Sequence, residues 1–98
     1  MGEVRTGVGA IICAAHNSSD GRLHGHTWEV TAWWPYAGSS ALGLQARLGE
    51  AVARFDHGLL PDDLAWGEAI ARYMGEELGC VAVDVSRPAE RIYARWEA

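Results

Sequence analysis

Three histidines in the first third of the chain have the spacing of a metal site. His24 and His26 flank one residue in a segment that predicts a strand, and alternate residues of a strand project from one face. His16 ends the preceding strand-like segment, so a hairpin closing between Asn17 and Leu23 brings it beside them. Three converging imidazoles suit Zn²⁺ with a fourth position left for water or substrate. The His-x-His pattern alone is explained more simply by two histidines on the surface of a strand. The expected position of His16 beside them is what favours a metal site.

A second candidate group is the adjacent pair Asp56 and His57. An aspartate can orient an imidazole and stabilise its charged form, which makes the pair a proton carrier near neutral pH. The alternative is a histidine near the C-terminal end of a helix that interacts with the helix dipole. The pair alone does not distinguish the two roles.

These residues need a sheet and helices to position them. Segments rich in Val, Ile, Thr and Trp predict strands, and apolar residues at three- and four-residue spacing predict helices. The expected elements are strands at 4–15 and 28–34, helices at 41–55 and 63–78, and strands at 81–85 and 91–96. The order ββααββ predicts an α+β fold, an antiparallel sheet with two helices on one face, as one domain over residues 1–98.

Composition limits the classes of partner. The chain has 98 residues, eight arginines and no lysine, thirteen acidic residues and a net charge of −5, so it lacks the basic stripe of a nucleic-acid-binding protein. Two cysteines make no disulfide framework, and the longest apolar run, 7–15, is too short to span a bilayer. We expect a soluble cytoplasmic protein with no nucleic-acid or membrane partner.

Three segments taken together resemble one enzyme family. ICAAH at 12–16, GRLHGHTWEV at 21–30 and FDHGLL at 55–60 are similar to the F-x-A-A-H, G-R-L-H-G-H and L-D-H-x-x-L segments of the 6-pyruvoyl-tetrahydropterin synthase and 6-carboxy-tetrahydropterin synthase family. The resemblance covers nearly the whole chain. It implies the tunnelling fold, in which ββααββ subunits form trimers that stack into hexamers, with active sites between subunits, so we expect a homo-oligomer.

The resemblance also implies roles for single residues. The family's three zinc ligands match His16, His24 and His26, and its Asp-His proton carrier matches Asp56 and His57.

The acid of the family's P-T-x-E segment, near the substrate pocket, matches Glu68. Trp66 and Gly67 stand where that segment has Pro-Thr or similar residues.

The first departure from the family is Asp20, which stands where the family has its catalytic cysteine. Cys13 does not replace that cysteine, because it lies three positions before His16 and therefore on the opposite face of the strand. Asp20 is a candidate base, and family relatives with an acid at this position cleave the side chain in an aldolase-like manner. Two alternatives are a turn residue before Gly21 and a fourth zinc ligand.

The second departure is Val85, the counterpart of the glutamate that anchors the pterin's amino-pyrimidine edge. A valine accepts no hydrogen bond from a guanidine-like edge, and Asp84 faces the other side of the strand. Trp28 shares the phase of His24 and is either a pocket wall beside the metal or an aromatic that fills the core. Together Val85 and Trp28 predict a flatter, less polar substrate than a pterin.

The predicted function is a zinc-dependent biosynthetic lyase or cyclase, of carbon–oxygen or aldolase-like type, with a small-molecule substrate. The alternative is a non-catalytic zinc-containing binding or assembly protein on the same fold. Retention of all three candidate ligands together with the Asp-His pair favours the enzyme.

Overall fold

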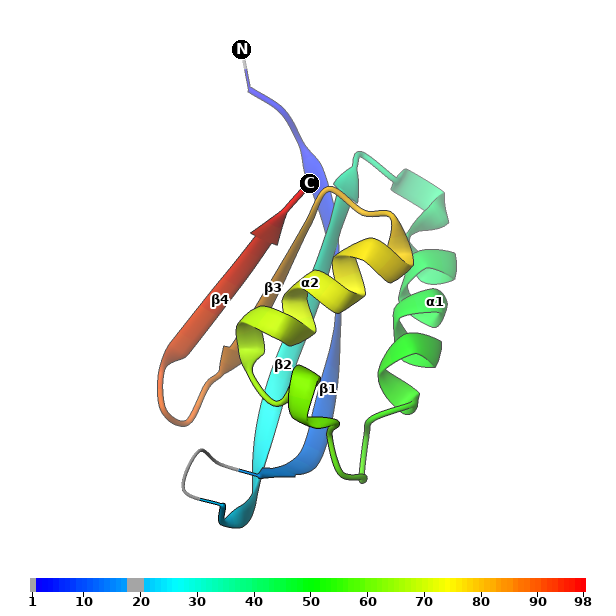
Figure 1. The fold of residues 1–98 in the computed structure, drawn as a ribbon. Coiled ribbons are helices and arrows are strands. Elements are labelled where there is room, and N and C mark those ends of the chain that lie inside the picture. Colours follow the sequence, from blue (N-terminus) through cyan, green and yellow to red (C-terminus); the bar gives the residue numbers. More distant parts are fainter. Residues whose placement is uncertain (1, 18–20) are drawn as a thin grey trace.

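A four-stranded antiparallel sheet carries both helices on one of its faces (Figure 1). The structure is a computed structural model that describes residues 2–17 and 21–98. Its main elements are β1 (Arg5–Asn17), β2 (Leu23–Pro35), α1 (Ala41–Ala53), α2 (Gly67–Leu78), β3 (Ala82–Arg87) and β4 (Ile92–Glu97), with short 3₁₀ turns η1 (Gly38–Ser40) and η2 (Asp62–Leu64). The predicted ββααββ order and α+β class are confirmed.

The strands of the sheet follow the order β1-β2-β3-β4, and each pairs with its neighbour in antiparallel fashion. Residues of one phase face the helices and form the core, as Ile12 opposite Trp28 and Val30 opposite Val85 show. Leu48 of α1 and Met74 of α2 complete this core from the helical side. Sheet and helices therefore enclose one apolar layer.

The boundaries of several elements differ from the sequence expectation. β1 and β2 reach Asn17 and Leu23, so all three candidate ligands lie in the paired part of the hairpin. The second helix starts at Gly67 and not near Asp63, because η2 and the extended backbone of Trp66 (φ −123°, ψ 151°) precede it. Trp66 therefore lies outside the helix that was expected at 63–78, and it is 47% exposed.

The sheet's other face is more polar. Trp33 packs there against Gly7, where an added Cβ would come within 2.7 Å of the indole. Its Nε1 donates to Asp84 at 2.9 Å, and Arg95 pairs with the same carboxylate. Trp33 and Asp84 therefore face away from Trp28 and Val85, as the strand phases predict.

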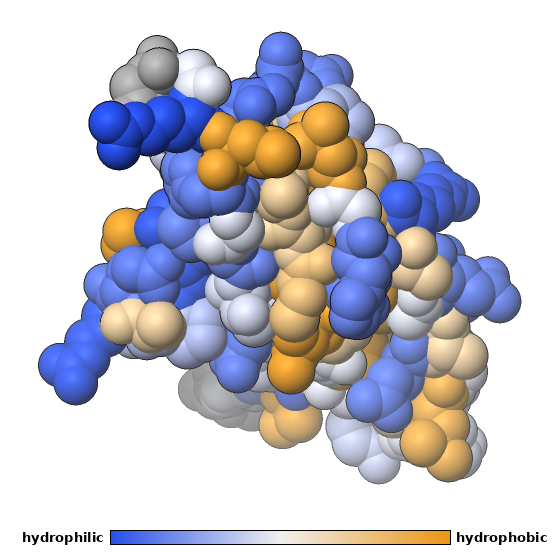
Figure 2. Space-filling model, turned by 90° about the horizontal axis from the view of Figure 1, so that it is seen from below, coloured by the Kyte–Doolittle hydropathy of each residue, from blue (hydrophilic) through white to orange (hydrophobic). Residues whose placement is uncertain are grey.

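The end of the molecule that carries the β1–β2 turn is drawn from below in Figure 2, and hydrophobic residues form a band there between hydrophilic ones. In the described part of the chain, no helix is both long enough and apolar enough to cross a membrane.

Helix α2 approaches the sheet closely because Gly75 has no side chain. A Cβ at Gly75 would overlap the indole of Trp96. We expect Gly75→Ala to lower the free energy of unfolding by about 1–3 kcal/mol through overpacking. A Cβ at Gly49 of α1 would meet only open space. Gly49→Ala should therefore raise the free energy of unfolding by about 0.5–1 kcal/mol through helix propensity. Urea unfolding of both variants tests this, and equal effects would contradict it.

Candidate metal centre

The pairing of β1 with β2 brings the three histidines together. His16 lies directly opposite His24, and His26 lies opposite Ala14, so all three side chains project from the same face. The ring centroids are 4.5 Å apart for His16 and His24, 4.9 Å for His16 and His26, and 4.7 Å for His24 and His26. The convergence predicted from the spacing is confirmed.

The ring nitrogens have the arrangement of a ligand set. One nitrogen from each histidine lies within 4.8 Å of the others, and Nε2 of His16 is 3.0 Å from Nε2 of His24. Two nitrogens bound to one tetrahedral zinc ion stand about 3.4 Å apart, so little movement is needed. Nδ1 of His16 and Nε2 of His26 are buried with no hydrogen-bond partner among the described residues. Buried polar atoms are rarely left without a hydrogen-bond partner. A metal ion bound by this group could supply the missing interaction.

Burial is uneven across the cluster. His16 is 1% exposed, whereas His24 is exposed to solvent. Two tryptophans pack edge-on against His16, with ring centroids 5.6 Å away for Trp28 and 5.5 Å for Trp66. The cluster therefore has an apolar wall on one side and access from solvent on the other, which matches a metal site with an open position.

Electrostatics favour the neutral form of His26. Burial, followed by the charges of Arg87, His16 and His24, lowers its pKa, while the hydrogen bond to Glu90 opposes this. Only a neutral imidazole has the lone pair that binds a metal. Hydrogen bonds from Arg87 lower the pKa of Glu90, so its carboxylate is the charged partner of His26.

A cavity of about 220 Å³ adjoins the cluster. It is lined by Trp28, Trp66, Gly67, Glu68, Val85, Ser86, Arg87, Ile92 and Ala94. Two of these residues, Trp28 and Glu68, were predicted from the sequence to bind substrate, and they share this cavity. Nε1 of Trp28 is buried without a partner among the described residues, which leaves one hydrogen-bond donor unused.

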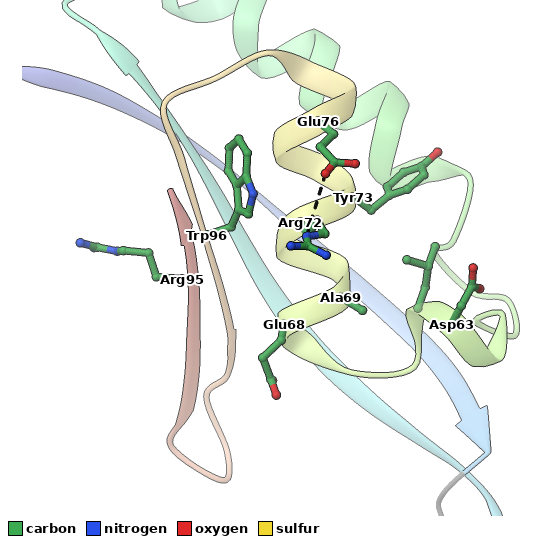
Figure 3. A pocket seen from close by; sticks show the side chains of 9 residues that line it. Asp63, Glu68, Ala69, Arg72, Tyr73, Glu76, Arg95 and Trp96 are labelled. Atoms are coloured by element: carbon green, nitrogen blue, oxygen red, sulfur yellow. Dashed lines mark ion pairs between the residues drawn. The ribbon is translucent and has the colours of Figure 1, made fainter. Parts of the chain in front are cut away.

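A larger cavity of about 550 Å³ lies between α2 and β4 and is shown in Figure 3. Its side chains are mostly charged, including Arg72 with Glu76 at 4.0 Å and Arg95 of β4. None of the three histidines lines either cavity, and Glu68 lines both, but only the smaller one is lined by Trp28 and Trp66, which pack against His16. Size alone does not make it the functional site, so we place the site at the smaller cavity.

The Asp56–His57 pair lies along the outer edge of β1. Oδ1 of Asp56 accepts from the backbone N–H of Cys13 at 2.8 Å, and the backbone N–H of Ala15 donates to Gly58. Oδ2 of Asp56 is 2.9 Å from Nδ1 of His57, and the bond from Cys13, followed by the interactions with His57, lowers the pKa of Asp56. His57 has a positive φ of 60° and its side chain is 82% exposed.

Asp56 and His57 are thus in contact, and no described hydrogen bond or ring contact joins His57 to the three clustered histidines. Asp20 lies outside the described residues, so its three alternative roles stay open. Sγ of Cys13 is 3.6 Å from Oγ1 of Thr27 on the other face, in agreement with its exclusion from the cluster.

Glu90 and Arg87, which lie beside the candidate metal site, were not predicted from the sequence, and Trp66 was expected inside a helix but lies just before α2. A signal for Glu90 existed, because β3 runs antiparallel to β2 and the turn after β3 must lie near the His26 end of β2. The position of Trp66 had no comparable signal, since it depends on where helix α2 begins.

Comparisons with known proteins do not assign the chain. No family model matches it, and no curated protein matches it. The resemblance to the pterin-synthase family therefore stays a prediction that rests on the three segments quoted above.

The three histidines predict one metal ion per chain. We expect the wild type and His57→Ala to bind one equivalent of Zn²⁺, because His57 lies outside the cluster, and His24→Ala to lose it. His24 is exposed, so its truncation should leave the fold intact. Free zinc at about 100 times Kd should stabilise the wild type by about 2.7 kcal/mol. Equilibrium dialysis with elemental mass spectrometry tests this, and full zinc content in His24→Ala would refute the site.

Proposed function

We propose that the chain is a zinc-dependent enzyme of the lyase or cyclase type that acts on a small planar substrate bound beside the three histidines. The observation that carries the proposal is the cluster of imidazole nitrogens within 4.8 Å of one another, next to Trp28 and Trp66, which pack against His16 and line a cavity. A closed structural site has no need of such a cavity, whereas a catalytic site needs room for substrate.

Zinc fits the donor set. His16, His24 and His26 supply three nitrogen ligands, an arrangement typical of catalytic zinc, and one side of the cluster is open through the exposed His24. When bound, zinc supplies Lewis acidity that polarises a substrate oxygen and acidifies neighbouring C–H bonds. The protein's own part is to exclude water on the side of Trp28 and Trp66.

The walls of the cavity favour a planar, weakly polar substrate. Trp28 and Trp66 offer aromatic surface, and Val85 presents only methyl groups. The volume of about 220 Å³ suits a molecule at or below the size of a single fused ring system. Ser86, Glu68 and Arg87 supply the few polar side chains available for orientation.

The proton carrier of the proposed reaction is His57 with Asp56. The carboxylate of Asp56 contacts Nδ1 of His57 and orients the ring, which leaves Nε2 to move a proton. The side chain is 82% exposed at the edge of β1, and in the proposed reaction it serves the site of another copy. The homo-oligomer of trimers or hexamers that the resemblance implies would supply that copy. Asp20 as a second base remains a prediction.

Support for the family comes from agreement at two levels. The ββααββ sheet is the architecture that the resemblance implies, and the three candidate ligands converge as that family requires. The competing function is a non-catalytic zinc-containing binding or assembly protein, which the same cluster would also serve. Conversion of a substrate by the zinc-loaded protein would distinguish the enzyme from the non-catalytic protein.

The enzyme hypothesis predicts that His57 is needed for turnover and not for zinc. The zinc-loaded wild type should convert at least one member of a panel of planar aromatic and heteroaromatic compounds with hydroxyl- or keto-bearing side chains. His57→Ala should lose about 10²–10⁴-fold in rate while keeping its zinc. Glu50→Ala, an exposed change on α1, serves as the matched control and should keep full rate. Mass spectrometry of the products measures the rates.

No turnover by zinc-loaded wild type across the panel would favour the binding or assembly protein. An unchanged rate in His57→Ala would remove the Asp-His pair from the reaction.

The replacement of the family's pterin-anchoring glutamate predicts weak pterin binding. Val85 leaves the donors of a guanidine-like edge unpaired, and such a loss costs a factor of about 10⁴ or more in discrimination. Titration calorimetry of the zinc-loaded protein with a dihydropterin should therefore give no saturable heat at micromolar concentrations. A micromolar Kd would contradict the non-pterin substrate while leaving the zinc site in place.

A further inference from the structure

Glu90 reaches the histidine cluster from the turn between β3 and β4. Its Oε1 lies 3.0 Å from Nδ1 of His26, although the two residues are 64 positions apart in the chain. An ionised carboxylate has no proton to donate, so the N–H of His26 must be at Nδ1. The lone pair is then on Nε2, which is the buried nitrogen that lacks a hydrogen-bond partner among the described residues.

Arg87 fixes the same carboxylate oxygen. Its Nε and Nη2 donate to Oε1 of Glu90 at 3.1 Å and 2.9 Å. The Arg87 side chain is only 19% exposed and forms part of the wall of the cavity beside the histidines. Oε1 thus accepts two N–H groups from Arg87 and one from His26. The two bonds from Arg87 fix the carboxylate in the position from which it holds the His26 ring.

We propose that Glu90 is a positioning residue of the metal centre: it holds the tautomer and ring orientation of His26 so that Nε2 faces the metal, and Arg87 keeps it in place. Metal-binding histidines commonly donate their second N–H to a carboxylate, and loss of that partner typically weakens metal affinity about 10–100-fold. The inference rests on the proposed zinc function, because it concerns how one ligand of that site is oriented.

The arrangement differs from an ordinary surface ion pair in two respects. His26 is 14% exposed in its side chain and has a second, buried nitrogen that lacks a hydrogen-bond partner among the described residues. The carboxylate of Glu90 also neutralises the guanidinium of Arg87, which would otherwise repel a cation bound by the three histidines. Orientation and charge therefore both favour the metal, and the experiment must separate them.

The test is the Zn²⁺ affinity of full-length variants, measured by competition with a chromophoric chelator. We expect Glu90→Ala to weaken binding about 10–100-fold and Glu90→Gln to recover part of that loss, because its amide oxygen still accepts from Nδ1. Glu50→Ala removes one negative charge on α1, away from the cluster, and should bind zinc like the wild type. If the wild type binds no zinc, the proposed function fails. If Glu90→Ala binds as tightly as the wild type, only the role of Glu90 fails.

Two further measurements separate orientation from charge and from folding. In Glu90→Ala/Arg87→Gln the repulsive guanidinium is gone, so affinity should stay low if orientation matters, and recovery to the wild-type value would overturn the proposal. With Co²⁺ in place of Zn²⁺, the visible absorption bands of Glu90→Ala should shift while those of Glu50→Ala stay unchanged. Identical bands in both variants would also overturn it. The melting temperature of the metal-free variants should match that of the wild type.

Discussion

The antiparallel register of β1 against β2 is the constraint on which the site depends. It pairs thirteen positions, from Arg5 with Pro35 to Asn17 with Leu23. Because side chains alternate between faces, a slip of one residue would send His24 and His26 to the face opposite His16. The same phase buries Ile12 opposite Trp28, so the apolar core that fixes the register also fixes the positions of the three histidines.

The second layer of the fold completes the site with residues distant in sequence. Trp66 lies just before α2 and packs against the buried His16, and the β3–β4 turn brings Glu90 to His26. His16 is 1% exposed and keeps one ring nitrogen without a hydrogen bond among the described residues, which costs stability in the metal-free chain. Metal binding would remove part of that cost, so folding and metal binding are expected to be coupled.

The sequence was sufficient wherever the determining geometry is local. The convergence of the histidines follows from the two-residue period of a strand and from the hairpin that joins β1 to β2. The partner of His26 and the location of His57 were not accessible in this way. Both depend on how separate elements pack: Glu90 through a strand pairing across the sheet, and His57 through backbone hydrogen bonds that hold its segment along the edge of β1. The start of α2 was missed because η2 and the extended Trp66 interrupt a pattern that otherwise predicts continuous helix.

The central claim is that three imidazoles, and no sulfur, bind one zinc ion at the end of the β1–β2 hairpin. X-ray absorption spectroscopy at the zinc edge on the zinc-loaded protein tests it most directly. The account predicts a first shell of nitrogen and oxygen at about 2.0–2.1 Å, with the outer-shell scattering of three imidazole rings. A sulfur neighbour at about 2.3 Å, or a shell of oxygen alone without imidazole scattering, would contradict it.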